Sequence, residues 1–190
     1  MKKIIIAIVC FFMLSCNVSY AMTDNAGVLA GLENNNNLYN YLNMYHYRLW
    51  KADHRFSKHD MYISQDDSVI VSLYNDKLGA IYILKPGYKT NKGIEVGMNT
   101  NDMKYAYGGI YDSMDSSLDY KQGGCIDGYG DGNYTGYYAV EYVSEKNEGL
   151  TFIIDRYVDR IVLIRYQENR HGNTHALGDV KSYNLLPYKR

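Results

Sequence analysis

Residues 137–167 read YYAVEYVSEKNEGLTFIIDRYVDRIVLIRYQ, and this stretch decides the fold. It contains three runs of β-branched and aromatic residues, which are 137–143, 150–155 and 160–167. Short polar segments separate the runs, as expected for turns between strands. Strands joined by such short connections pair in the antiparallel sense, because a parallel pair needs a long crossover. The stretch therefore predicts three adjacent antiparallel strands.

A second set of short strands is predicted upstream, at residues 61–64, 69–74 and 80–84. The polar triplets 65–67 and 75–77 mark the turns between them, so the three strands are expected to form an antiparallel meander. Because side chains alternate along a strand, Ile81 and Ile83 should lie on one face and Tyr82 on the other.

Apolar residues at helical spacing occur in two further segments. In the first, 38–49, a helix fits slightly better than a strand, although the tyrosines there nearly alternate. In the second, Asn99 or Thr100 can cap a helix that runs to Tyr107 and ends at Gly108. Met103 and Tyr107 would then form part of its apolar stripe.

These elements predict an α+β fold: an antiparallel sheet with one or two packed helices, forming a single domain over residues 38–190. Residues 109–136 are rich in Gly, Asp, Ser and Tyr and lack a sustained period, which predicts a long irregular loop. The segment after residue 167 is expected to be mostly irregular, with a short strand near 180–186.

The composition excludes several classes of protein. The chain has 190 residues, of which 46% are hydrophobic and 22% are charged, and its formal net charge is -1. These values describe a globular domain with a core and not a disordered, collagen-like or coiled-coil chain. The charge balance gives no broad attraction for nucleic acid or anionic lipid. The content of 22 tyrosines against four phenylalanines is unusual.

The first 21 residues have the pattern of an export signal. Lys2 and Lys3 precede the apolar run 4–14, which is too short for a stable membrane span. Ser19 and Ala21 place small residues before a cleavage site that leaves a chain starting at residue 22. The Asn-rich segment 22–37 is then expected to be a flexible tether.

A competing interpretation of the signal is a bacterial lipobox at residues 13–16, in which Cys16 would carry a lipid anchor. Soluble export is favoured over this lipoprotein. The expected location is the periplasm or the exterior, or the envelope surface if Cys16 is lipidated. No transmembrane span is expected in the mature chain.

Residues 93–103, GIEVGMNTNDM, and 153–164, IIDRYVDRIVLI, together resemble a known family. They are similar to small exported bacterial envelope proteins of the SmpA/OmlA outer-membrane-assembly lipoprotein type, which are also likened to β-lactamase-inhibitor-protein domains. The resemblance covers residues 88–167 and implies helices packed on an antiparallel sheet. Gly97 and Asp102 match the turn and helix of the family motif, a folding signature that carries no catalytic residue.

No motif predicts a catalytic, cofactor-binding or metal site. Asp127, Asp131 and Asn133 could supply oxygen ligands, but their spacing does not fit a calcium loop. The histidine pairs His171 with His175 and His54 with His59 are interpreted as surface histidines. Cys125 is the single cysteine left after cleavage, and it has no histidine nearby in sequence.

The residues singled out for recognition are the tyrosines of the 109–136 loop, which are Tyr111, Tyr120, Tyr129 and Tyr134. Tyrosine gives a large contact area at low rotamer cost, which suits a binding surface. The expected function is therefore a non-enzymatic envelope protein that binds or scaffolds another envelope protein. The alternative is a secreted hydrolase or protein inhibitor that uses this loop.

Overall fold

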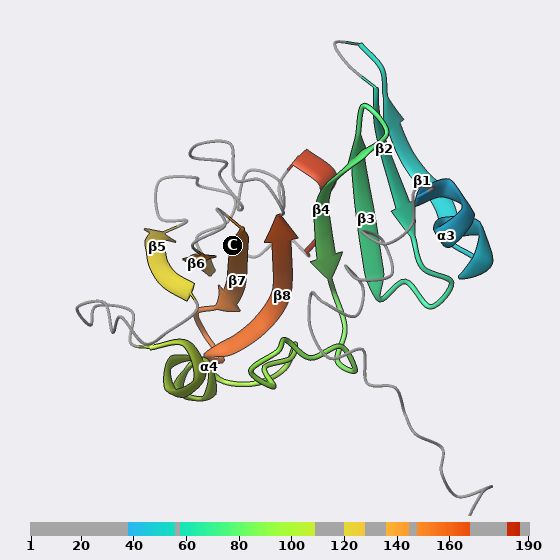
Figure 1. Cartoon of the computed structure of the whole chain (residues 1–190). Coiled ribbons are helices and arrows are strands. Elements are labelled where there is room, and N and C mark those ends of the chain that lie inside the picture. The colour runs from blue at the N-terminus through green and yellow to red at the C-terminus, as the bar shows by residue number, and fades with distance from the viewer. Residues whose placement is uncertain are drawn as a thin grey trace, which may run out of the picture.

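The computed structural model describes residues 38–55, 58–108, 120–127, 136–144, 148–167 and 182–186. In chain order its elements are α3 (Leu38–Met44), β1 (Arg48–Asp53), β2 (His59–Ile63), β3 (Val69–Tyr74), β4 (Lys77–Ile83), α4 (Thr100–Tyr107), β5 (Tyr120–Asp127), β6 (Tyr137–Ser144), β7 (Gly149–Asp155) and β8 (Arg160–Gln167). The described strands form one antiparallel sheet in the order β1-β2-β3-β4-β8-β7-β6-β5 (Figure 1). The predicted α+β class with an antiparallel sheet is confirmed, and most of the described structure is sheet.

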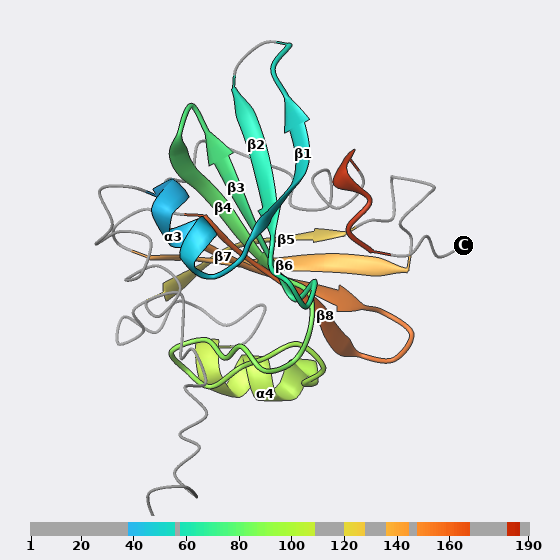
Figure 2. The ribbon, with the colours of Figure 1, turned by 90° about the vertical axis from the view of Figure 1, so that its right-hand side faces the viewer.

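Both predicted strand groups are present, and they are joined into one sheet. The meander β2-β3-β4 and the group β6-β7-β8 have the expected antiparallel pairing. The junction is the pairing of β4 with β8, which extends over three residue pairs: Ile81 with Tyr166, Tyr82 with Arg165 and Ile83 with Ile164. The sheet is strongly twisted, so the strands of one half run at a steep angle to those of the other (Figure 2).

Three predictions of secondary structure are wrong in part. The helix expected over 38–49 ends at Met44, and β1 starts at Arg48 as a fourth strand of the meander. The loop expected over 109–136 contains β5, which pairs with β6 along its length. The short strand expected near 180–186 is absent from 182–186, where Ser182 and Tyr183 are helical. The helix ends early at the left-handed residue His46, whereas β1 and β5 are strands because β2 and β6 supply pairing partners.

Several sequence-based expectations fall on residues that the structure does not describe. These are the signal over 1–21 and the tether over 22–37. Among the described residues, no helix has the length and apolarity needed to cross a membrane.

Each face of the sheet carries its own hydrophobic cluster. On one face, α3, α4 and the segment before α4 contribute Leu42, Met103 and Ile94 to a core that includes Ile81 and Ile83. On the other face, Tyr82 belongs to a second cluster, against which the described segment 182–186 packs. The predicted alternation along β4 is confirmed, and β4 is buried from both sides.

The helix α4 begins as its sequence predicts. The Asn99 Oδ1 atom accepts a hydrogen bond from the backbone N–H of Asp102 at 3.0 Å, so Asn99 is the N-cap. The Thr100 hydroxyl donates to the Asp159 carboxylate at 2.8 Å, which fixes the helix start to the β7–β8 turn. Gly97 has φ of 96°, a conformation that favours glycine.

The buried side of α4 lies on an aromatic cluster. The Tyr107 ring is 5.2 Å from the Tyr142 ring and 5.4 Å from the Phe152 ring, measured between centroids. All three side chains are buried, and the Tyr107 hydroxyl donates to Asn91 Oδ1 at 3.0 Å. The polar tip of each buried tyrosine needs such a partner. Met103 and Tyr107 thus form the apolar stripe predicted for this helix.

Replacing Asn99 by Ala should lower the free energy of unfolding by about 1 kcal/mol, because the first turn of α4 loses its cap. The matched control is Asn101→Ala, since Asn101 is an exposed residue within the same helix. This control should change stability by no more than a few tenths of a kcal/mol. Urea unfolding followed by circular dichroism measures both values. Equal losses in the two variants would contradict the capping role.

Candidate functional site

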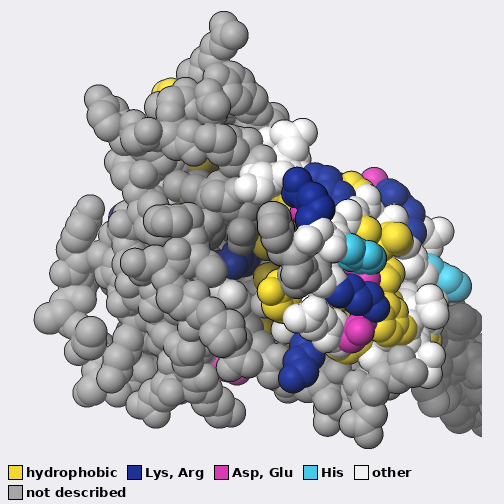
Figure 3. All heavy atoms as spheres, turned by 90° about the horizontal axis from the view of Figure 1, so that it is seen from above, with side chains coloured by type: hydrophobic (Ala, Val, Ile, Leu, Met, Phe, Trp, Pro, Cys, Tyr) yellow, Lys and Arg dark blue, Asp and Glu magenta, His cyan; other side chains and the backbone are white. Residues whose placement is uncertain are grey.

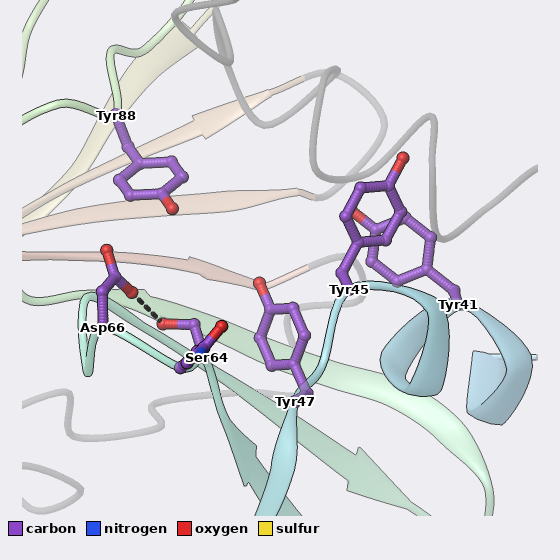
Figure 4. Close-up of a pocket in the computed structure, with 7 residues that line it drawn as sticks. Tyr41, Tyr45, Tyr47, Ser64, Asp66 and Tyr88 are labelled. Carbon is purple, nitrogen blue, oxygen red and sulfur yellow. Dashed lines mark hydrogen bonds between the residues drawn. The ribbon is translucent and has the colours of Figure 1, made fainter.

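Four tyrosines line a hollow of about 380 Å³ at the end of the sheet near α3. This tyrosine pocket is formed by Tyr41, Tyr45, Tyr47, Ser64, Gln65, Asp66 and Tyr88. The tyrosines come from α3, from the segment joining α3 to β1, and from the segment after β4 (Figure 4). The polar residues come from the turn between β2 and β3. The volume lies in the range of ligand pockets, which is about 300–1,000 Å³.

The end of α3 brings three of the tyrosines together. The backbone N–H of Tyr47 donates to the Leu42 carbonyl at 2.8 Å, and that of His46 donates to the Asn43 carbonyl at 3.1 Å. His46 has φ of 57°, so these bonds form a Schellman motif with His46 in the left-handed conformation. The motif reverses the chain at the helix end. As a result Tyr47 turns back beside Tyr41 and Tyr45 instead of continuing away from the helix.

The β2–β3 turn holds the carboxylate of Asp66 in a fixed orientation. The Asp66 Oδ1 atom accepts hydrogen bonds from the Ser64 hydroxyl at 2.7 Å and from the Ser68 hydroxyl at 2.6 Å. It also accepts the backbone N–H of Ser68 at 3.1 Å. Among the described residues, no other residue donates a hydrogen bond to the second oxygen, Oδ2, and no cationic side chain forms an ion pair with Asp66.

Tyr88 closes the pocket from the opposite side. Its hydroxyl oxygen lies 3.3 Å from Ser68 Oγ, which ties the segment after β4 to the β2–β3 turn. In Figure 4 the hydroxyl groups of Tyr88 and Tyr47 both point into the space beside Asp66. On the α3 side, the rings of Tyr41 and Tyr45 lie 4.6 Å apart and 41° from parallel. The pocket thus has aromatic walls and oxygen atoms at its centre.

The environment of the pocket disfavours negative charge on Tyr41 and Tyr47. Burial, with contributions from Tyr45 and Tyr88, raises the pKa of Tyr41 to about 12. Burial also raises the pKa of Tyr47, and Tyr41, Tyr88 and Asp66 add to this effect. Burial raises the pKa of Asp66, but the hydrogen bonds from Ser68 and Ser64 outweigh it, so this pKa lies below its usual value. At neutral pH Asp66 is ionised and the two tyrosines are neutral.

A second hollow of about 280 Å³ is lined by Lys51, Ala52, Asp53, His59, Met61, Ser182 and Tyr183. Its charged groups already have partners within the chain: Lys51 Nζ donates to the Tyr183 carbonyl, and Asp53 pairs with Arg55 at 2.6 Å. Seen from above, the described surface mixes Lys or Arg, His, and Asp or Glu with apolar side chains (Figure 3). The tyrosine pocket is therefore the stronger candidate site.

The residues singled out from sequence are not brought together in the described structure. Tyr120 is the first residue of β5, Cys125 lies within it opposite Val140, and Asp127 is its last residue. His54 and His59 have separate partners, Asp60 and Ser72. Several of the singled-out residues lie outside the described residues, namely Cys16, Tyr111, Tyr129, Asp131, Asn133, Tyr134, His171 and His175.

The tyrosine pocket was not predicted from sequence. The available signal was the concentration of tyrosines at 39, 41, 45 and 47, which periodicity alone assigns to a helix stripe. Compared with family models, curated proteins and solved structures, the chain matches none. The resemblance to the SmpA/OmlA type therefore stays a prediction, and the site is judged on its geometry.

Substituting His46 by Val should lower the free energy of unfolding by about 1–2 kcal/mol, because a β-branched residue is disfavoured in the left-handed conformation. His46→Gly should retain stability to within about 1 kcal/mol, since glycine adopts that conformation readily. Asn43→Val is the control, because Asn43 is exposed and lies within α3. Thermal unfolding of the three variants measures the order. A loss in Asn43→Val as large as that in His46→Val would contradict the Schellman geometry.

Proposed function

We propose that this protein is an exported, non-enzymatic protein of the bacterial cell envelope that binds a protein partner through the tyrosine pocket. The observation that carries the proposal is the gathering of four tyrosines around one fixed carboxylate. Export rests on the signal-like residues 1–21. In this proposal the α+β structure is a single domain that follows a cleaved signal, and the SmpA/OmlA resemblance supports an envelope location.

Exposed apolar side chains beside the pocket support protein binding. Tyr45, which lines the pocket, is 55% exposed, and its sequence neighbour Met44 is 64% exposed. Leu49, at the start of β1, is 56% exposed. Aromatic residues and methionine are enriched at the centres of protein interfaces, where they contribute large contact areas. A partner seated over the pocket would cover these side chains and bury its aromatic walls.

The chemistry of the pocket favours binding over catalysis. Apart from tyrosines, Asp66 is the one titratable side chain in the described lining. General acid–base hydrolysis uses two groups with different protonation states, or a nucleophile with an adjacent base. Tyr41 and Tyr47 have raised pKa values and therefore cannot serve as bases at neutral pH. The groups present are suited to holding a ligand in place.

A photo-crosslinking amino acid placed at Tyr45 should form a discrete adduct with one envelope protein in living cells. The same amino acid at Tyr105 is the control, because Tyr105 is 96% exposed but lies on α4. Denaturing gel electrophoresis followed by mass spectrometry identifies the adduct. The adduct at position 45 should disappear in Tyr88→Ala, which removes one wall of the pocket. Equal adducts at both positions, or an adduct that survives Tyr88→Ala, would contradict the proposal.

Intact-mass spectrometry of the protein isolated from its own cells should give the mass of a chain that begins at Met22. This result follows from cleavage after Ala21, where small residues fit the signal-peptidase pocket. A mass that corresponds to a lipid-modified Cys16 would replace soluble export with envelope anchoring. The full-length mass of the chain, with residues 1–21 retained, would contradict export by a cleaved signal.

A further inference from the structure

We infer that the tyrosine pocket receives a lysine side chain of the partner, whose ammonium group binds between Asp66 and the hydroxyls of Tyr47 and Tyr88. The inference rests on the proposed function and names the chemical group that the site recognises. Its structural basis is a carboxylate whose Oδ2 atom accepts no hydrogen bond from another described residue, in a pocket lined by four tyrosines.

The carboxylate is prepared for a cation before any partner binds. Three hydrogen bonds from Ser64 and Ser68 hold Asp66 Oδ1, so that the plane of the carboxylate is set by the turn. The nearby basic groups bind atoms other than the Asp66 carboxylate: Arg48 pairs with Asp67 at 2.6 Å, and Lys85 Nζ donates to the backbone carbonyl of Asp66 itself. The Oδ2 atom can therefore accept from an incoming donor without breaking a described ion pair. Such preorganisation reduces the cost of binding.

The charges inside the pocket favour a ligand of one charge sign. Burial is the largest cause of the raised pKa of Tyr47, and the charge of the Asp66 carboxylate adds to it, so negative charge is disfavoured at that hydroxyl. Of these causes, the negative charge of Asp66 favours a positive charge in the same space. An anionic ligand would meet the Asp66 carboxylate, and the described lining of the pocket contains no cationic side chain to balance it. The pocket thus discriminates against phosphates and carboxylates and favours an ammonium ion.

The shape and donor count of lysine fit this arrangement. A lysine ammonium has three N–H donors and no acceptor. Asp66 Oδ2 and the oxygens of Tyr47 and Tyr88 supply three acceptors around one space (Figure 4). The aliphatic stem can pack along the rings of Tyr41 and Tyr45, because only the ammonium end of a lysine side chain is polar. Attraction between the cation and the ring faces adds to the binding.

The test is a nuclear magnetic resonance titration of the folded protein with Nα-acetyl-lysine methylamide as the probe. We expect a dissociation constant on the order of 1 mM and binding at least about tenfold weaker for the norleucine analogue, which lacks the ammonium group. Asp66→Asn should weaken lysine binding by about tenfold or more. Asp67→Asn is the matched control, because Asp67 is the next residue but pairs with Arg48 and does not line the pocket. It should leave binding within about twofold.

Several outcomes would overturn the inference. They are equal binding of the lysine and norleucine probes, equal losses in Asp66→Asn and Asp67→Asn, or no binding of the lysine probe to the folded protein. Binding of methyl β-glucoside in the pocket, without binding of the lysine probe, would replace a lysine with a saccharide ligand. Amide spectra of each variant establish that it is folded.

The lysine inference can fail while the proposed function stands. In that case the adduct formed from position 45 in cells would persist in Asp66→Asn and disappear in Tyr88→Ala. If the lysine inference is correct, the adduct is lost in both variants and retained in Asp67→Asn. A third outcome is that no pocket-dependent crosslink forms although the lysine probe still binds. That outcome would exclude a protein partner and show that the pocket binds small amines.

Discussion

The pairing of β4 with β8 over three residue pairs is the contact on which the whole sheet depends. Strands β1 to β4 lie on one side of it and strands β5 to β8 on the other. Its side chains serve both faces, because Ile81, Ile83 and Tyr166 enter one core and Tyr82 enters the other. Arg165, which is 3% exposed, lies opposite Tyr82 in the register of β4 and β8. Its Cζ atom lies 6.0 Å from the centroid of the Tyr82 ring. Three residue pairs are sufficient to hold the two halves of the sheet together because the junction is buried on both faces of the sheet.

The tyrosine pocket depends on the first half of the sheet and on two tight turns within it. The Schellman motif at His46 and the turn containing Asp67 both place a non-glycine residue at positive φ. The first turn positions Tyr41, Tyr45 and Tyr47, and the second fixes the carboxylate of Asp66. Local backbone geometry that carries a cost is often retained at functional sites. Here the two turns place the aromatic walls and the charged group on opposite sides of one space.

Sequence reasoning succeeded where local signals and tertiary packing agree. The β2–β3–β4 meander and the start of α4 follow from alternation, polar turns and the capping residue Asn99. It failed at 45–49, where helical spacing competes with a strand at the edge of the sheet. The left-handed residue His46 ends the helix there, and periodicity does not detect such a residue. It also missed β5, because a Gly-rich segment becomes a strand only when β6 supplies a pairing partner.

The sequence by itself determined the strand runs, their short connections, the N-cap of α4 and the tyrosine-rich composition. These depend on residues within a few positions of one another, so they can be read along the chain. Only the tertiary structure decided that Tyr41, Tyr47, Asp66 and Tyr88 share one pocket. Tyr88 is separated from α3 along the chain by the four strands β1 to β4 and meets it only after these strands have paired. A site assembled from segments so far apart depends on sheet register and twist, which no local pattern encodes.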